Sequence, residues 1–364
     1  MLIKNCLKEI PMEELVNALK EQKDFYDQNI DELFRVRDYL ISPLNTPKEF
    51  VENRYFLTDQ QKNFKNKILE EINKTREEFV PIGITGSAGT GKTLLLYDIA
   101  KNINEKVCVI HCGNLSSGHQ YLNDHCKNMT ILPAKALRSD LSMKEYNVIC
   151  VDECHRMHLE QFKKLLKEVK LNRKRALFSY DDAQKLQKKE YNAHIVDILK
   201  NEDTFYEFKL SNRIRTNKEI ASFITKIMTI KSHDNIYSYP SVKILYAQNK
   251  SEADKIIRLH NDYKFIRFTP SQYGTDSLTS YGLDSDHTTH EVIGQEYDNV
   301  IIVMDDIFTY NEKGQLTAYR HPNPDYLYTK MLFQALTRCR EKLAIIIVGD
   351  RDLFNTVFSI VNKE

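Results

Sequence analysis

The chain has 364 residues, which is enough for two or three domains of ordinary size. Hydrophobic residues make up 41% of them, so sizeable cores can form, yet no apolar run approaches the roughly 20 residues of a membrane span. The 52 Lys and Arg nearly balance the 51 Asp and Glu, and the net charge of +1 excludes a protein that attracts polyanions by its overall charge.

The seven cysteines are scattered along the chain and lack the paired spacing of metal sites. No signal peptide is recognisable at the start of the sequence. We therefore expect a reducing, cytoplasmic environment and no membrane partner.

Residues 1–54 predict an N-terminal helical segment. Apolar residues recur at helical spacing in 12–23 and 30–40, and the stretch SPLNTP at 42–47 then interrupts the pattern. This segment carries no chemical motif, so we expect it to pack on the core or on a partner.

From about residue 55, short β-branched runs alternate with helical sequence, which is typical of parallel sheets flanked by helices. A first series of runs lies at 82–85, 107–111, 147–151 and 176–179, and a second lies at 242–246, 265–268, 300–303 and 343–348. The pattern predicts an α/β fold with two lobes in tandem, residues 55–208 and 209–364.

The stretch GSAGTGKT fills every position of the pattern G-x-x-x-x-G-K-[ST], between a strand-like and a helix-like run. Glycines let successive backbone N–H groups point at phosphate oxygens, and the following helix adds its positive dipole. The sequence therefore predicts a loop that binds a nucleoside triphosphate, with Thr93 also a ligand of Mg²⁺. Its expected members are Gly86, Ser87, Ala88, Gly89, Thr90, Gly91, Lys92 and Thr93. A glycine-rich turn that binds nothing is the weaker alternative.

Asp152 and Glu153 follow a buried strand-like run, at the strand end where ligands of such sheets bind. We expect Asp152 to hold Mg²⁺ and Glu153 to orient or deprotonate the attacking water. A zinc site with Cys154, His155 and His158 is the alternative, but it lacks a fourth ligand. We prefer a place for His155 beside the γ-phosphate.

A series of stretches in chain order resembles the motifs of superfamily 1 helicases and translocases, whose core is two RecA-like lobes with ATP between them. The stretches are FLTDQQ at 56–61, the phosphate loop, DECH at 152–155, SYDDAQ at 179–184, LSNRIR at 210–215, TTHEVIGQEYD at 288–298 and ALTRCR at 335–340. The resemblance covers about residues 55–350, and CGNLSSG at 112–118 is similar to the Schlafen-type helicase-like ATPases.

This resemblance implies a RecA-like P-loop fold for both lobes and a role for individual residues. Gln61 would read the adenine, Gln184 would sense the γ-phosphate, and Glu296 would contact the ribose or triphosphate. Arg338 would bring positive charge to the γ-phosphate as the arginine finger, and Arg215, with Arg213 as its alternate, would be the catalytic arginine of the motif that opens the second lobe. Tyr180 departs from the family pattern, because it replaces the usual glycine of its motif.

A motor of this family needs a path for single-stranded DNA or RNA across both lobes. We expect Asn114, Ser116, Ser117 and His119 to contact the strand in the first lobe, and Thr288 and His290 in the second. The basic run at 163–175 could meet phosphates as well, but a solvated helix face is slightly favoured.

The resemblance implies a helicase-like ATP hydrolase that couples hydrolysis to translocation or remodelling of a single strand. An alternative is an ATP-driven switch subunit of a nuclease-containing phage-defence or restriction complex. A phosphotransferase acting on a small substrate is a third interpretation, which Arg338 and the 288–298 motif argue against. Short gaps between the motifs indicate a minimal motor that works beside a nuclease or another effector protein.

Overall fold

The computed structural model describes residues 41–74, 79–138, 143–181, 194–211, 217–232, 238–270, 277–282, 287–318 and 326–362. The chain divides into two compact units, residues 1–39 and 40–364, and every described residue belongs to the second. The helices expected at 12–23 and 30–40, and the predicted site residues Gln184, Arg213 and Arg215, lie outside the described residues.

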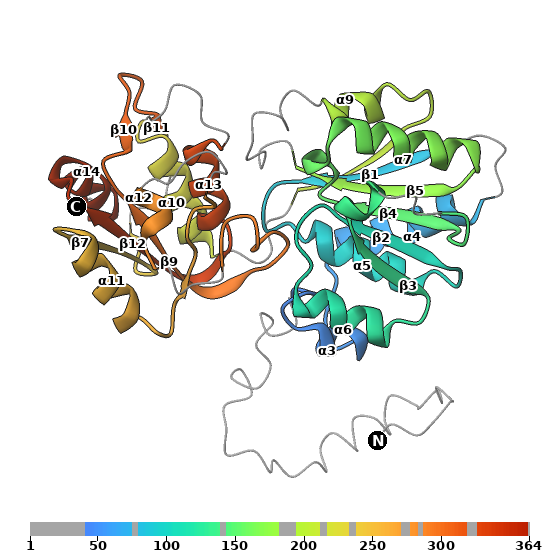
Figure 1. Ribbon diagram of the computed structural model, residues 1–364, viewed down its shortest axis with the longest axis horizontal. Helices are drawn as coiled ribbons and strands as arrows, with labels where there is room; N and C mark the ends of the chain where they lie inside the picture. Colours follow the sequence, from blue (N-terminus) through green and yellow to red (C-terminus); the bar gives the residue numbers. More distant parts are fainter. Residues whose placement is uncertain are drawn as a thin grey trace, which may run out of the picture. The chain divides into compact units, whose positions relative to one another are not determined.

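The first lobe is built on a six-stranded sheet of order β3-β2-β4-β5-β1-β6, in which every neighbouring pair is parallel (Figure 1). Its strands are β1 (Pro81–Gly86), β2 (Val107–His111), β3 (Met129–Pro133), β4 (Val148–Asp152), β5 (Arg175–Tyr180) and β6 (Tyr206–Leu210). Its helices are α3 (Pro47–Val51), α4 (Asp59–Asn73), α5 (Lys92–Asn102), α6 (Ser117–His125), α7 (Leu159–Leu171) and α9 (Ile195–Lys200). Figure 1 shows α7 and α9 on one side of this sheet and α5 and α6 on the other.

Alternation along the central strands divides the core of this lobe into two layers. On β2, Val109 points to the layer of α4, α5 and α6, whereas its neighbours Cys108 and Ile110 point to the layer of α7 and α9. Both faces are covered, so all residues of β2 and β4 are buried and these strands are apolar throughout most of their length.

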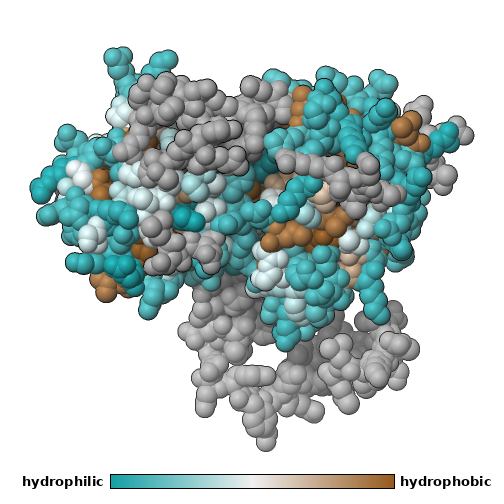
Figure 2. Space-filling view, viewed as in Figure 1, coloured by the Kyte–Doolittle hydropathy of each residue, from teal (hydrophilic) through white to brown (hydrophobic). Residues whose placement is uncertain are grey.

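The second lobe contains a four-stranded parallel sheet of order β7-β12-β9-β8 with its own hydrophobic core. Its strands are β7 (Val242–Ala247), β8 (Lys264–Phe265), β9 (Tyr297–Met304) and β12 (Cys339–Val348), with an antiparallel hairpin of β10 (Phe308–Tyr310) and β11 (Leu316–Ala318). The helices are α10 (Lys218–Met228), α11 (Lys250–Leu259), α12 (Ser277–Ser280), α13 (Tyr328–Leu336) and α14 (Arg351–Val361). The face drawn in Figure 2 is mainly hydrophilic, as expected for lobes that hold their apolar side chains inside. None of the described helices is long and apolar enough to cross a bilayer.

The predicted α/β class with parallel sheets flanked by helices is confirmed. The pattern missed β3 at one sheet edge, and it ended the first lobe at residue 208, whereas β6 pairs with β1 as far as Leu210. β6 is an edge strand of sequence YEFKL whose side chains are mostly exposed, so hydrophobicity carries little signal there. β8 is also shorter than the run expected at 265–268.

The described part of the expected N-terminal segment packs on the first lobe. Ile41, Leu44 and Phe50 are buried in the same core layer as α4 and α5. Only α3 is helical within 41–54, because the prolines at 43 and 47 confine the helix to the stretch that begins at the second of them.

Candidate functional site

The phosphate loop joins the end of β1 to the start of α5. Gly89 and Gly91 have φ of 74° and 82°, a conformation that only glycine adopts without strain. Gly91 is the N-cap of α5 and has no side chain to bond the first turn, so the amides of that turn are left for an external acceptor. Thr90 Oγ1 closes the loop by donating to the Ser87 carbonyl at 2.9 Å. This geometry suits an anion at the helix N-terminus.

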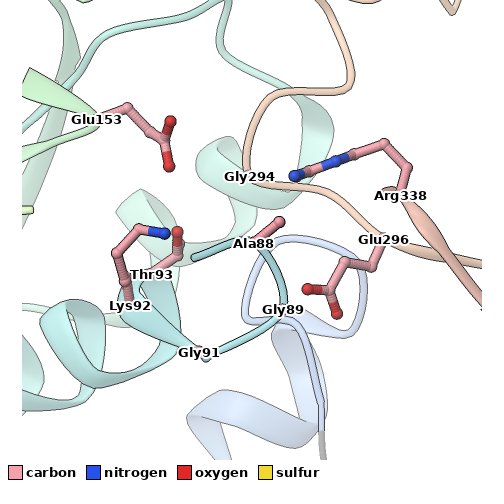
Figure 3. A pocket seen from close by; sticks show the side chains of 9 residues that line it. All are labelled: Ala88, Gly89, Gly91, Lys92, Thr93, Glu153, Gly294, Glu296 and Arg338. Atoms are coloured by element: carbon pink, nitrogen blue, oxygen red, sulfur yellow. The ribbon is translucent and has the colours of Figure 1, made fainter. Parts of the chain in front are cut away.

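Lys92 is buried at the base of this loop. Its ammonium donates to the carbonyl oxygens of Gly86 and Ser87 at 2.7 and 3.1 Å, and it lies 3.4 Å from Asp181 Oδ2. Figure 3 shows the ammonium beside the Thr93 hydroxyl, with the Glu153 carboxylate on the same side. The loop therefore holds a positive charge where phosphate groups would lie.

Asp152 ends β4 and is fully buried. Its Oδ1 accepts a hydrogen bond from Ser179 Oγ at 2.7 Å and lies 3.4 Å from Thr93 Oγ1. Its Oδ2 has no hydrogen-bond partner among the residues that the structure describes. A hydroxyl and a carboxylate oxygen are ligands that Mg²⁺ prefers, so Thr93 and Asp152 fit the predicted metal site. No cluster of three or more His, Cys, Asp or Glu in the described ranges is arranged to hold a metal, which gives the zinc alternative no support.

Glu153 adopts a left-handed conformation with φ of 59°, which is strained for a residue with a side chain. Its N–H donates to Ser179 Oγ at 3.0 Å, and its Oε2 accepts from Arg156 Nε at 3.1 Å. Burial alone would raise the pKa of this carboxyl, but the electrostatic influence of its neighbours His155, Arg156, Lys92 and Arg338 outweighs burial and holds the pKa well below its usual range. A carboxylate this acidic is better suited to orient a water molecule than to take its proton.

His155 connects two of the motifs. Its Nδ1 accepts the backbone N–H of Asp181 at 3.1 Å, which places the proton of a neutral ring on Nε2, 3.5 Å from Glu153 Oε2. Asp181 in turn faces Lys92. The DECH stretch, the start of SYDDAQ and the phosphate loop thus form one continuous set of contacts.

A pocket joins residues of both lobes (Figure 3). Its lining residues are Ala88, Gly89, Gly91, Lys92, Thr93, Glu153, Gly294, Glu296 and Arg338. The Arg338 guanidinium donates to the Gln295 carbonyl at 3.1 Å. Burial lowers the pKa of Arg338, and the nearby carboxylates of Glu296 and Glu153 offset only part of this effect. The expected loop, water-orienting carboxylate and arginine therefore share one cavity.

Gln61 is buried beside the phosphate loop and braces it. Its Oε1 accepts the Thr58 N–H at 3.0 Å as part of a capping box, and its Nε2 donates to the Thr90 carbonyl at 3.2 Å. Both ends of the amide contact protein groups here, and Gln61 does not line the pocket. Adenine recognition by Gln61 stays a prediction.

The residues expected to contact a strand differ in their exposure. Asn114 is exposed. Ser116 is half-buried and forms the N-cap of α6, where its N–H and its hydroxyl each lie 2.9 Å from His119 Nδ1. Thr288 is buried and its hydroxyl accepts the Glu291 N–H at 3.4 Å. These strand contacts also stay predictions, and Asn114 is the best placed to make one.

His290 is half-buried, with its ring 5.5 Å from that of Tyr326.

In the basic run at residues 163–175, Lys170 pairs with Glu202 at 2.6 Å and Arg175 pairs with Glu105 at 2.6 Å. Both cations already have protein partners, but only Lys170 lies on α7, because Arg175 begins β5, so the predicted helix face covers only the first part of the run.

Several contacts around the pocket have no signal in the sequence. Arg156 donates to Gln334 Oε1 at 3.1 Å across 178 positions of the chain. Asn45 clasps the backbone of Glu296, donating to its carbonyl at 2.7 Å and accepting its N–H at 3.2 Å, across 251 positions. The polar identity of these residues is visible in the sequence, but their partners are not.

Comparison with known proteins gives one family. The model described as Schlafen group 3, DNA/RNA helicase domain, matches residues 81–268, just over half of the chain. No curated protein gives a significant match.

Several solved structures are similar. A Pif1 helicase from Bacteroides in complex with ADP-AlF3 and ssDNA is 12% identical, with 85% of this chain and 98% of that chain covered and a TM-score of 0.44. Bacteroides Pif1 bound to ssDNA is 13% identical, with 83% and 94% covered and a TM-score of 0.44. The arterivirus nonstructural protein 10 (helicase) with DNA is 13% identical, with 76% and 63% covered and a TM-score of 0.43.

Proposed function

The chain belongs to the Schlafen group 3 DNA/RNA helicase domain family, and from this membership we propose that it is an ATP hydrolase that moves along or remodels a single nucleic-acid strand. The observation that carries the proposal is the shared pocket. It combines the phosphate loop and Glu153 of the first lobe with Glu296 and Arg338 of the second. A loop that only turned the chain would not need a buried carboxylate and a buried arginine opposite it.

In this proposal Lys92 and the loop amides bind the β- and γ-phosphates. Mg²⁺ held by Thr93 and Asp152 would neutralise the charge that develops on the phosphate oxygens. Glu153 orients the attacking water, and Arg338 places a positive charge on the γ-phosphate, where the loose transition state needs it. Gln184 and Arg215 keep the roles that the sequence predicts for them.

Coupling to movement follows from the position of Arg338. A γ-phosphate in the pocket would contact Lys92 on one lobe and Arg338 on the other, and it would therefore favour an arrangement in which the lobes are held together. Hydrolysis removes that contact. We expect a strand to be bound by Asn114 on the first lobe and by His290 on the second. The distance between these two contacts would then change once per cycle of ATP hydrolysis.

The test is ATP turnover by the full chain against the concentration of single-stranded DNA and, separately, RNA, at low and high salt. We expect a saturable acceleration whose half-point rises steeply with salt, because phosphate contacts release counterions. Glu153→Gln is the control that assigns the turnover to this pocket. A flat response to both nucleic acids would contradict the motor and favour the switch subunit of a nuclease-containing complex.

A second measurement concerns duplexes. The isolated chain should unwind long duplexes poorly, because the short gaps between its motifs leave no room for a large strand-splitting insertion. Robust unwinding of a long duplex without any partner would overturn the interpretation as a minimal motor.

A further inference from the structure

Two fully buried histidines lie behind the predicted magnesium carboxylate. His111 ends β2 and His119 lies in the first turn of α6, and their rings are 4.4 Å apart. Buried polar atoms without a hydrogen-bond partner among the described residues gather around them, namely both ring nitrogens of His111, Nε2 of His119, the hydroxyl of Tyr97 and Oδ2 of Asp152. Burying polar groups without hydrogen bonds costs free energy, so we expect this cluster to have a function.

His119 holds the loop that precedes α6. Its Nδ1 accepts the Ser116 N–H at 2.9 Å, next to the Ser116 hydroxyl at the same distance. Burial, together with the neighbouring His111, lowers the pKa of His119 to about 2, so its ring is neutral and carries its proton on Nε2. The loop from Gly113 to Ser116, which includes the exposed Asn114, therefore ends on a rigid, uncharged ring.

His111 lies close to both the His119 ring and the Asp152 carboxylate. β2 and β4 pair in register with His111 opposite Asp152, and His111 Nδ1 lies 3.4 Å from Asp152 Oδ2. The backbone of the loop also lies close to His111, because a Cβ added at Gly113 would lie 2.7 Å from His111 Nε2. The loop therefore lies against His111 at Gly113 and against His119 at Ser116, and His111 in turn lies against Asp152.

We propose that His111 and His119 are positioning residues that transmit strand contact at residues 113–116 to the Asp152 carboxylate. This inference rests on the proposed function, which supplies the strand contact at Asn114 and the metal role of Asp152. A strand bound to the loop displaces the Ser116 amide, the His119 ring follows it, and the ring contact moves His111 against Asp152. Close packing allows this, because a fully buried ring has no free space in which to absorb a displacement.

The test uses substitutions that separate the two functions of each ring. His119→Asn retains a side-chain oxygen where Nδ1 accepts the Ser116 amide, but it removes the ring that contacts His111. His111→Asn retains an amide donor near Asp152 and removes the same ring contact from the other side. His125→Asn is the matched control, because His125 is an exposed histidine of the same helix whose ring stacks on Tyr121.

ATP turnover is measured with no strand and with saturating single strand, so that weaker strand binding alone cannot lower the ratio of the two rates. We expect His119→Asn and His111→Asn each to lower this ratio about 2- to 30-fold, the range by which side chains between coupled sites change the coupling. The double variant should be no worse than the more affected single variant, because both remove one contact. The ratio of His125→Asn should equal that of the wild type.

The outcomes separate this inference from the proposed function. If no single strand accelerates the wild-type chain, the proposed function fails. If the wild type is accelerated and either asparagine variant, folded by its thermal melt, keeps the wild-type ratio, the histidine pair is only packing and the inference is overturned. Additive effects in the double variant would also overturn it, since the two rings would then act separately.

Discussion

At the scale of single residues, one hydroxyl organises both acidic side chains of the pocket. Ser179 Oγ donates to Asp152 Oδ1 at 2.7 Å and accepts the N–H of Glu153 at 3.0 Å. The hydrogen bond from the Glu153 N–H helps to hold Glu153 in its left-handed conformation, which is otherwise unfavourable for a residue with a side chain. Ser179 precedes Tyr180, and Tyr180 stands where the family pattern has glycine. The Ser179 hydroxyl therefore does not replace a group that the motif specifies.

Ser179→Ala should therefore impair the pocket and lower stability together. It leaves a buried carboxylate oxygen and a buried amide without this partner, at a cost of about 1–3 kcal/mol. Chemical denaturation measures the free energy of unfolding, and ATP turnover reports on the pocket. Ser222→Ala is a matched control, because it removes a buried hydroxyl that bonds Tyr239 in the second lobe. Equal turnover in the two folded variants would contradict the role of Ser179.

Glu153→Gln should retain nucleotide binding and lose ATP turnover, because it keeps the shape of the side chain and removes the charge that orients water. Lys92→Ala should instead lose nucleotide binding, since it removes the cation beneath the phosphates. Binding of a fluorescent ATP analogue and phosphate release measure the two steps. Undiminished phosphate release by Glu153→Gln would move the catalytic role to another residue.

The pH dependence of stability provides a separate test of Glu153. Its pKa is lower in the folded state than in the unfolded chain, so the ionised carboxylate stabilises the fold above the unfolded pKa of about 4.3. That contribution is lost as the pH falls through and below this value. Replacement by Gln should therefore cost stability at neutral pH and progressively less in acid, as followed by thermal melts. A constant difference across the range would contradict the depressed pKa.

At the scale of elements, the connector at residues 41–46 is packed between α6 and the pocket. Leu44 lies against Gly118 of α6 and close to Gly294, and Asn45 clasps the backbone of Glu296. Gly294 and Glu296 both line the pocket. The connector therefore positions pocket residues although it contains no recognisable motif.

Gly118→Ala tests this packing. A Cβ at this position would lie 2.0 Å from the Leu44 carbonyl oxygen, so the backbone of the connector has to shift, at a cost of about 1–3 kcal/mol. In an unconstrained helix the same change stabilises by about 1 kcal/mol, so the sign of the effect is diagnostic. Ser117→Ala is the control, because Ser117 is an exposed residue of the same first turn. A higher melting temperature for Gly118→Ala would show that the connector does not pack there.

At the scale of the whole molecule, the pocket exists only because two separate hydrophobic cores bring their loops together. The first core carries the phosphate loop, and the second carries β12, which begins directly after Arg338. Arg156 and Gln334 add a direct hydrogen bond between the lobes at 3.1 Å. Turnover should therefore depend on residues that never contact the phosphate loop itself.

Arg338→Ala should lower ATP turnover on the order of 10³-fold while nucleotide binding weakens much less, because the guanidinium acts mainly on the transition state. Arg340→Ala is the control, because Arg340 is the neighbouring arginine of the same motif, lies 3.6 Å from Asp298 and does not line the pocket. Steady-state turnover and nucleotide affinity separate the two effects. A normal rate in Arg338→Ala would mean that the second lobe takes no part in hydrolysis.

Local sequence accounts for the features of this protein that depend on near neighbours in the chain. Glycines at 89 and 91 and the lysine after them specify the phosphate loop within one turn of chain, and a β-branched run followed by Asp152 and Glu153 specifies a buried strand with carboxylates at its end. Alternating runs predicted the parallel sheets for the same reason, since periodicity is a local property.

Which polar groups form contacts depends instead on how distant segments pack together. The Ser179 hydroxyl, the Asn45 clasp and the pair of His111 and His119 join residues from different elements, and β6 is a strand because β1 offers it an edge. Side chains such as these have no distinctive local propensity, so their roles follow from the packing of distant segments. Burial then gives each contact its energetic weight, because a polar group removed from water must find its partner wherever the fold has placed one.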